Sequence, residues 1–303
     1  MRKSCGWALM LLAASVLAPA QERRSEWNLR GHIPVDKVTV QSHRGAGVLA
    51  PENSIEAFEL AWGLGTVPEA DLRTTRDGVI VAFHDNDFKR ILPGAPAEWH
   101  KKGIQDLTWE EVRKLDIGAW KGPKYAGQRV PRTAELYEVL RKHPERRFYI
   151  DIKNVDLTQL AAEAQKAGVA ARLILASADY SVIRRWRQLA PESATLHWMG
   201  GSEETLAARL AELRKAEFAA ITQLQIHVRT KQAPGGEVMT PSAPFLVDTG
   251  RELRRHNILF QVLPYGIDDP KMFWRLMDLG VASFASDYPD ITVKAIRDYY
   301  AAR

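Results

Sequence analysis

The stretch PEADLRTTRDGVIVAFHD, residues 68–85, carries two carboxylates two positions apart and a histidine close behind them. A D-G turn pair separates an acidic segment from the apolar run VIVAF, so the stretch predicts two strands joined by a turn. Side chains two positions apart share one face of a strand. Glu69 and Asp71 are therefore expected to point the same way, with His84 at the end of the second strand.

Two more segments place charged side chains near the end of a predicted strand. Asp151 and Lys153 are again two positions apart in FYIDIK, and His43-Arg44 closes VTVQSHRG. All of these side chains fall toward the carboxyl ends of their strands. If the strands are parallel, the side chains meet at one edge of the sheet.

Three carboxylates in one small volume repel each other, and unpaired buried charge is costly. A divalent cation bound by Glu69, Asp71 and Asp151 removes that repulsion. Carboxylate oxygens are hard donors, and no cysteine lies near them, so Ca²⁺ or Mg²⁺ is favoured over a soft-ligand metal. The alternative is that the acids form structural salt bridges with nearby cations: Arg44, Arg73 and Lys153.

The remaining polar residues at these strand ends suit proton transfer and anion binding. Histidine in general titrates near neutral pH, so the pair His43 and His84 can do acid and base work. Arg44 and Lys153 can hold a phosphate. A metal, two histidines and two cations together predict cleavage of a phosphodiester. The other histidines considered are interpreted as structural or exposed: His100, His143, His227 and His256.

These residues must be positioned by a regular alternation of strand-like and helix-like segments that runs along the chain. Counting the two strands of residues 68–85 as one position gives eight strand–helix units, which predicts a (β/α)8 TIM barrel. Residues of approximately 86–129 form a small insertion after the second strand, with one short helix at TWEEVRKL. A doubly wound open sheet is the alternative, but HRGAG lacks the G-x-G-x-x-G spacing. In a TIM barrel, chemistry sits at the carboxyl ends of the strands.

The composition and the N-terminal residues limit the classes of protein to which this chain can belong. The 303 residues are 46% hydrophobic and 26% charged, an ordinary globular balance. Residues 1–20 have Arg2 and Lys3, an apolar run and then A-P-A, the layout of a cleavable signal peptide; a retained anchor is the alternative. Cleavage removes Cys5, the only cysteine, and lowers the formal charge from +5 to +3. We therefore expect a secreted or periplasmic protein with no stable membrane span after cleavage and no nucleic-acid partner.

The segment SHRGAGVLAPENSIEAFELAWGLGTVPEADLRTTRDGVIVAFHD resembles the glycerophosphodiester phosphodiesterase family. The shared pattern is H-R-G, then P-E-N with a helix, then E-x-D with T-x-D-G, then H-D. Further on, FYIDIKN is similar to the family's E-I-K strand, and GVASFASDYPD to its closing T-D-x-P strand. The resemblance covers nearly all of residues 38–299, within an expected domain of residues 38–303.

The resemblance implies a metal-dependent TIM-barrel enzyme that hydrolyses deacylated phospholipids to glycerol 3-phosphate and an alcohol. By position it implies His43 and His84 as the acid/base pair, Arg44 and Lys153 as phosphate ligands, and Glu69, Asp71 and Asp151 as ligands of one Ca²⁺ or Mg²⁺. Two departures stand out. The third acid is usually glutamate, and the seventh strand reads LFQVLPYG where the family often has a tryptophan near the substrate. Trp120, Trp198 and Tyr265 are candidates for the alcohol side of the pocket, and core or loop packing is the alternative for them. Gln225 and His227 share a face of the sixth strand, from which they could enter the pocket.

Two other functions fit the same barrel. A lysophospholipase D or sphingomyelinase D-like phosphodiesterase shares the two histidines but needs an apolar groove for acyl chains. A non-catalytic binding barrel predicts gaps in the catalytic set, and the sequence has none of the expected gaps.

Overall fold

The computed structural model describes residues 25–233 and 236–302, and its centre is a closed barrel of eight parallel strands. Neighbouring strands pair in the cyclic order β1, β10, β9, β7, β6, β5, β4, β2 and back to β1. The strands are β1 (Thr39–Ser42), β2 (Val67–Thr74), β4 (Phe148–Asn154), β5 (Leu173–Ser177), β6 (Ala194–Met199), β7 (Gln223–Ala233), β9 (Leu259–Pro264) and β10 (Ser283–Ser286). The predicted (β/α)8 TIM barrel is confirmed, and the open sheet is excluded.

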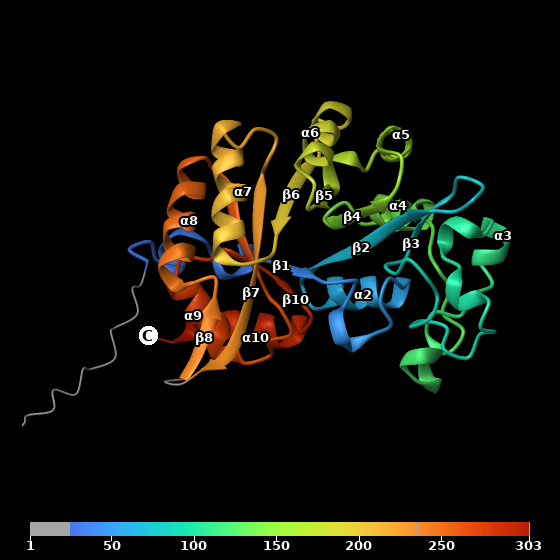
Figure 1. The fold of residues 1–303 in the computed structure, drawn as a ribbon, viewed down its shortest axis with the longest axis horizontal. Helices are drawn as coiled ribbons and strands as arrows, with labels where there is room; N and C mark the ends of the chain where they lie inside the picture. Colours follow the sequence, from blue (N-terminus) through green and yellow to red (C-terminus); the bar gives the residue numbers. More distant parts are fainter. Residues whose placement is uncertain (1–24, 234–235, 303) are drawn as a thin grey trace, which may run out of the picture.

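Helices follow the barrel strands and cover the outside of the barrel (Figure 1). They are α2 (Ile55–Gly63), α4 (Thr133–Lys142), α5 (Leu157–Lys166), α6 (Tyr180–Leu189), α7 (Glu203–Lys215), α8 (Ala243–Arg255), α9 (Pro270–Asp278) and α10 (Pro289–Ala301). Several begin at side-chain caps, as at Ser54, whose hydroxyl accepts a hydrogen bond from the Ala57 N–H at 3.2 Å. Their apolar faces pack on the strands and form the main core.

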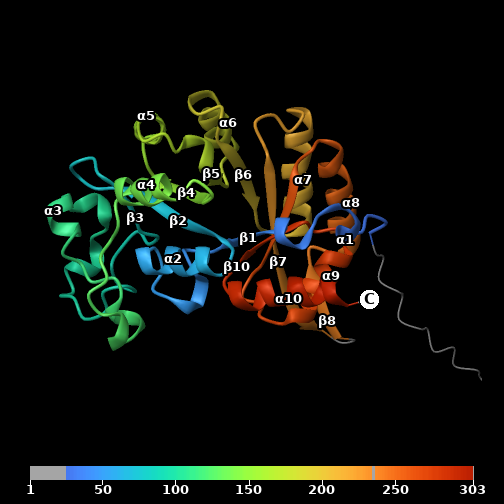
Figure 2. The ribbon, with the colours of Figure 1, turned by 180° about the vertical axis from the view of Figure 1, so that it is seen from behind.

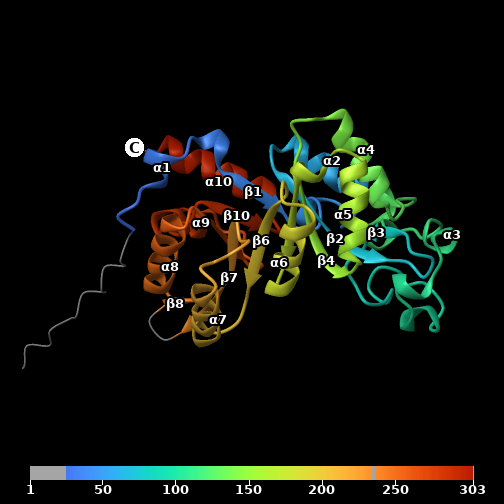
Figure 3. The same ribbon diagram turned by 90° about the horizontal axis from the view of Figure 1, so that it is seen from above.

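The short helix α1 (Leu29–His32) precedes the barrel and is tied to its end. Figures 2 and 3 show it beside α10, near the C-terminus. Arg30 Nη1 donates to the Ala302 carbonyl at 2.6 Å, and the Tyr300 hydroxyl donates to the Ile33 carbonyl at 2.7 Å. The predicted signal peptide, residues 1–20, lies outside the described residues. Among the helices that the structure describes, none has both the length and the apolar content needed to cross a membrane.

The segment after the second barrel strand forms the predicted small insertion with its own apolar core. Strand β3 (Ile80–Ala82) pairs antiparallel with β2, and α3 (Trp109–Val112) lies in the segment that follows it (Figure 1). The predicted cap of α3 is present, since the Thr108 N–H donates to Glu111 at 2.8 Å. Phe88, Ile104 and Val112 are fully buried in the insertion's core. This packing holds the insertion against the end of β2, where the predicted site lies.

One element departs from the sequence-based expectation. The strand expected to end near residue 228 continues as β7 to Ala233 and pairs antiparallel with β8 (Gly236–Thr240). This two-stranded ribbon extends the chain beyond the barrel wall. Arg229, Lys231 and Gln232 in the added part of β7 are polar and exposed, so this segment lacks the apolar alternation that indicates a strand.

Candidate active site

The register of two barrel strands brings the three predicted acids together. Asp71 on β2 lies opposite Asp151 on β4, and Glu69 is two residues earlier on the same face as Asp71. One carboxylate oxygen from each residue falls within 4.8 Å of the others. Glu69 and Asp71 are 2% and 1% exposed, so their charges meet in a buried volume.

Glu69 has one satisfied and one unsatisfied carboxylate oxygen. Its Oε2 accepts a 2.7 Å hydrogen bond from the Arg44 backbone N–H, while its buried Oε1 has no partner among the described residues. Burial, then the charges of Asp71 and Asp151, raises the pKa of Glu69 to about 8. A buried carboxylate oxygen without a donor is where a cation would bind.

Asn53 fixes the carboxylate of Asp71 from the loop before α2. Its amide nitrogen donates to Asp71 Oδ2 at 3.0 Å, and its Oδ1 accepts from the Asp71 N–H at 2.9 Å. Both Asn53 and Arg44 adopt positive φ, at 55° and 53°. Such backbone conformations cost energy for non-glycine residues and concentrate at functional sites.

Lys153 neutralises part of the acid cluster. Its Nζ lies 2.8 Å from Asp151 Oδ2 and 3.0 Å from Asp71 Oδ1. Burial disfavours the charged amine, but the charges of Asp71 and Asp151 outweigh it and raise the pKa of Lys153. The pKa values of two of the acids shift in opposite directions. Burial raises the pKa of Asp151, whereas the pKa of Asp71 is lowered to about 2 because the charges of Lys153 and Arg44 outweigh its burial.

The alternative, that the acids form structural salt bridges with nearby cations, is confirmed in part. Lys153 pairs with two of the acids, and Arg44 Nε lies 3.8 Å from Asp71 Oδ2. Arg73 is different, because it donates to the His84 carbonyl at 2.7 Å and to the Asn86 side chain at 2.7 Å. These pairs leave Glu69 Oε1 without a donor, so the donor set still fits a divalent cation that prefers oxygen ligands.

His43 stands at the end of β1 with a carboxylate behind it. Its Nδ1 lies 2.6 Å from Asp287 Oδ1, and the imidazole is 25% exposed. Burial alone would lower the pKa of His43, but the hydrogen bond to Asp287 and the charges of Glu69 and Asp287 raise it above 6.5. The backbone at position 47 packs closely against the backbone of Asp287. Only glycine fits there, because a Cβ on Gly47 would lie 2.0 Å from the Asp287 carbonyl oxygen.

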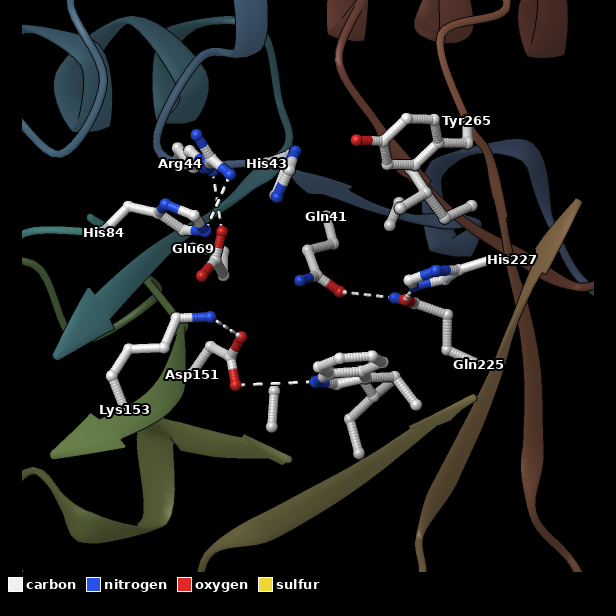
Figure 4. Close-up of a pocket in the computed structure, with 15 residues that line it drawn as sticks. Gln41, His43, Arg44, Glu69, His84, Asp151, Lys153, Gln225, His227 and Tyr265 are labelled. Atoms are coloured by element: carbon white, nitrogen blue, oxygen red, sulfur yellow. Dashed lines mark hydrogen bonds and ion pairs between the residues drawn. The ribbon is translucent and has the colours of Figure 1, made fainter. Parts of the chain in front are cut away.

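His84 has a different environment on the other side of the acid cluster. Its Nδ1 lies 2.6 Å from Asp85 Oδ1, and its Nε2 lies 2.8 Å from Arg44 Nη2. A guanidinium only donates, so Nε2 accepts, and Nδ1 carries the proton that it donates to Asp85. This arrangement directs the Nε2 lone pair of His84 toward Arg44 (Figure 4).

A closed ring of hydrogen bonds holds His84 and Arg44. Arg90, in the insertion, contacts both oxygens of Asp85 at 2.8 and 2.9 Å and both oxygens of Glu52 at 2.6 and 2.7 Å. Glu52 in turn accepts from Arg44 Nη1 at 3.3 Å. The ring runs from Arg90 through Asp85, His84, Arg44 and Glu52 back to Arg90. Two paired forks of this kind fix orientation better than single contacts. Glu52, His84 and Asp85 also lie close enough to hold an ion, but Arg90 already pairs with both acids.

These residues form one side of a cavity of about 280 Å³ at the carboxyl ends of the strands. Figure 4 shows His43, Arg44, Glu69, His84, Asp151 and Lys153 on one side and Gln225, His227 and Tyr265 on the other. Trp198 also lines this cavity, whereas Trp120 lines an adjoining one of about 230 Å³. The strand-end rule thus places all seven predicted site residues together; Asp71 belongs to the acid cluster but does not line the cavity.

Several residues of the site were not predicted as functional. Asp287, Asp85 and Glu52 lie in the motifs D-Y-P, H-D and P-E-N, so their position next to predicted residues was a usable signal. Gln41 is two residues before His43 and shares its strand face. Arg90 lies in the insertion, and its sequence context carries no such signal.

Known proteins are similar to this chain in sequence and in fold. The glycerophosphoryl diester phosphodiesterase family matches residues 43–291. A glycerophosphodiester phosphodiesterase of Bacillus subtilis is 25% identical over 99% of this chain and 100% of its own length. A solved glycerophosphodiester phosphodiesterase of Agrobacterium tumefaciens superposes with a TM-score of 0.64 at 23% identity, covering 85% of this chain and 99% of the other.

A second solved structure of similar fold is a complex with a reaction product. It is an Oleispira antarctica phosphodiesterase in complex with the product sn-glycerol-3-phosphate, with a TM-score of 0.65 and 22% identity over 89% of this chain and 99% of that one. At this identity the two structures show the shared barrel. The family match, which spans most of the barrel and all seven predicted residues, shows more: this chain belongs to the glycerophosphoryl diester phosphodiesterase family.

Proposed function

We propose that this enzyme, a phosphoric diester hydrolase by its family, cleaves glycerophosphodiesters to glycerol 3-phosphate and an alcohol in a metal-dependent reaction. One observation carries the proposal: three carboxylates and two cations meet between two histidines, each of which has its own carboxylate partner. The family match and the product bound by the Oleispira antarctica relative support it.

Glu69, Asp71 and Asp151 would hold one divalent cation, Ca²⁺ or Mg²⁺, since all three offer hard oxygen ligands. When bound, the cation supplies Lewis-acid polarisation of a phosphoryl oxygen. Asp151 has a shorter arm than glutamate, but its oxygen lies within 4.8 Å of those of the other two acids, close enough for a shared ion.

Arg44 and Lys153 would bind the non-bridging phosphoryl oxygens. Both line the cavity, and both are partly exposed, at 23% and 21% of their side chains. Fixed cations at the site of developing charge stabilise the transition state and are a large term in phosphoryl chemistry.

The two histidines would exchange protons with opposite ends of the reaction. His84 has an unprotonated Nε2 in this arrangement, which suits a base that takes the proton of the nucleophile, either water or the adjacent glycerol hydroxyl. The raised pKa of His43 favours the imidazolium, which suits an acid that protonates the leaving alcohol. Asp287 occupies Nδ1 of His43, so Nε2 is the nitrogen left to donate this proton.

The lysophospholipase D and sphingomyelinase D alternatives are less well supported by the cavity. Its aliphatic lining consists of four short or medium side chains: Ala176, Leu196, Leu263 and Ala285. An acyl chain needs a longer apolar surface than these provide.

Release of glycerol 3-phosphate from glycerophosphocholine, with lysophosphatidylcholine and sphingomyelin assayed in parallel, tests the proposal. We expect turnover of the soluble diester and little of the lipids. Replacing His43 or His84 by alanine should lower kcat by roughly two to four orders of magnitude. Near-full activity in either variant would contradict its role, and no turnover with added Ca²⁺ or Mg²⁺ would favour a non-catalytic barrel.

We further propose that residues 1–20 are a cleavable signal peptide and that residues 38–303 form the catalytic domain, which would place the enzyme in the periplasm or outside the cell. N-terminal sequencing of the exported protein checks this. A mature chain that begins at Gln21 is expected, and a chain that retains its first residues would contradict it.

A further inference from the structure

The side of the cavity that faces the acid cluster is built from uncharged polar and aromatic side chains. We call it the neutral wall; it consists of Gln41, Trp198, Gln225, His227 and Tyr265. Both carboxylates that line the cavity, Glu69 and Asp151, belong to the opposite side (Figure 4). Burial, then the charges of His43 and Arg229, lowers the pKa of His227 to about 4, so this ring is neutral at physiological pH.

Hydrogen bonds below the cavity fix the orientation of Gln261. The Ser283 hydroxyl donates to the Thr39 carbonyl at 2.8 Å, so its oxygen accepts from Gln261 Nε2 at 3.0 Å. The other end of the Gln261 amide, Oε1, is then an acceptor, and Gln225 Nε2 donates to it. A buried amide oriented in this way cannot flip without losing these bonds.

The side-chain amide of Gln225, oriented by Gln261, in turn orients the side-chain amide of Gln41. Gln225 Nε2 also donates to Gln41 Oε1 at 3.3 Å, and Gln225 Oε1 accepts from His227 Nε2 at 3.1 Å. The amide nitrogen of Gln41 therefore points away from Gln225 and toward the acid side of the cavity (Figure 4). It has no hydrogen-bond partner among the residues that the structure describes, so its N–H groups are available to a ligand.

The aromatic rings of the neutral wall are poorly placed to bind a cation. Recognition of a quaternary ammonium uses open aromatic faces. Here His227 stacks on Trp198 with ring centres 5.2 Å apart and planes 7° apart. The Arg229 guanidinium lies 3.9 Å from the centre of the Tyr265 ring and would repel a second cation.

We propose that the neutral wall binds the variable alcohol of the diester and selects a neutral polyol, such as glycerol or inositol, over an amino alcohol such as choline or ethanolamine. This inference rests on the phosphodiesterase function proposed above. A polyol hydroxyl can accept from Gln41 Nε2 without reorganising the wall, because the amide is already oriented. A choline head group offers that donor no acceptor and brings its charge toward Arg229.

The test is a panel of four diesters with the same glycerol 3-phosphate half and the same saturating metal: the glycerol, inositol, choline and ethanolamine esters. We expect kcat/KM for the glycerol and inositol esters to exceed that for the choline and ethanolamine esters by about tenfold or more. Equal or better hydrolysis of the choline ester would overturn the inference while leaving the phosphodiesterase function intact. Failure to cleave any of the four would instead overturn the function on which it rests.

Two methionine variants locate the effect. Gln41→Met removes the free donor and should reduce the polyol-to-choline ratio of kcat/KM by about tenfold. Gln223→Met is the matched control: Gln223 is also 5% exposed inside the barrel, but it pairs with the Tyr149 hydroxyl at 2.7 Å below the cavity. It should keep the wild-type ratio. If Gln41→Met lowers kcat/KM equally on all four esters, the shared glycerol contacts this wall and the inference is wrong.

Discussion

The ammonium group of Lys153 lies 2.8 Å from a carboxylate oxygen of Asp151, two residues earlier on the same strand. The same nitrogen lies 3.0 Å from Asp71. Lysine thus contacts two of the three carboxylates that would bind the cation, while Glu69 Oε1 has no donor among the described residues. The proposed phosphate binding by Lys153 and the proposed metal binding by the acids would therefore be coupled through shared oxygens.

Replacing Lys153 by methionine separates these two roles. The loss of a cation near the phosphoryl oxygens should lower kcat by about 10²-fold. The metal concentration that gives half-maximal activity should stay the same or fall, because Asp71 and Asp151 lose a competing partner. Lys215→Met, which removes a surface lysine paired with Glu212, is the control. A tenfold rise in the half-maximal metal concentration for Lys153→Met would contradict this account.

Asp151 tests whether the shorter acid ligates the metal. Asp151→Asn keeps the shape but loses the charge, and we expect the half-maximal metal concentration to rise roughly tenfold or more. Asp151→Glu restores the longer arm and should retain metal-dependent activity. Asp268→Asn, at an exposed loop position, should behave as wild type. Unchanged metal dependence in Asp151→Asn would mean that Asp151 serves only as the partner of Lys153.

The pH profile tests the role of His43. As an acid, His43 must be protonated, and its raised pKa keeps the proton bound to higher pH. Asp287→Asn removes a charge and weakens the hydrogen bond that together raise this pKa, so the alkaline limb of kcat/KM should move to lower pH. The control is Asp290→Asn, at an exposed position. Asp278→Asn would not serve, because Asp278 accepts a hydrogen bond from the Tyr299 hydroxyl. A shift to higher pH, or no shift, would contradict the assignment of His43 as acid.

Arg90 tests whether the insertion positions the catalytic groups without contacting substrate. Arg90→Met breaks the ring at both Asp85 and Glu52, which orient His84 and Arg44. We expect kcat to fall by roughly tenfold to a hundredfold, with partial recovery in Arg90→Lys, which restores the charge but not the fork.

A purely structural role for Arg90 would appear as lowered thermal stability with kcat unchanged in the folded fraction. Arg113→Met, which removes an exposed pair with Glu110 in the same insertion, controls for surface charge and should leave kcat at the wild-type value. If Arg90→Met matches Arg113→Met in kcat, the ring has no part in catalysis.

Local patterns in the sequence were sufficient to predict the barrel and to select seven residues that the fold brings together. Strand periodicity placed Glu69 and Asp71 on one face of their strand. Strict alternation of strands and helices placed the carboxyl ends of all the barrel strands at the same end of the barrel. The β7–β8 ribbon was not predicted because its sequence lacks the alternation of apolar and polar residues that a strand with one buried face shows. The pairing of Arg90 with Asp85 and Glu52 depends on how an irregular insertion packs, and the orientation of Gln41 depends on amides from three strands. Neither relation has a fixed spacing in the sequence.

The most direct test of the account is metal add-back. The purified enzyme is stripped of divalent ions, and glycerol 3-phosphate release from a glycerophosphodiester is followed as Ca²⁺, Mg²⁺ or Mn²⁺ is restored singly. We predict negligible release in the stripped enzyme, saturable recovery with Ca²⁺ or Mg²⁺, and no comparable recovery in Glu69→Gln. Full activity in the stripped wild type, or equal recovery in Glu69→Gln, would contradict the claim that these acids hold a catalytic cation.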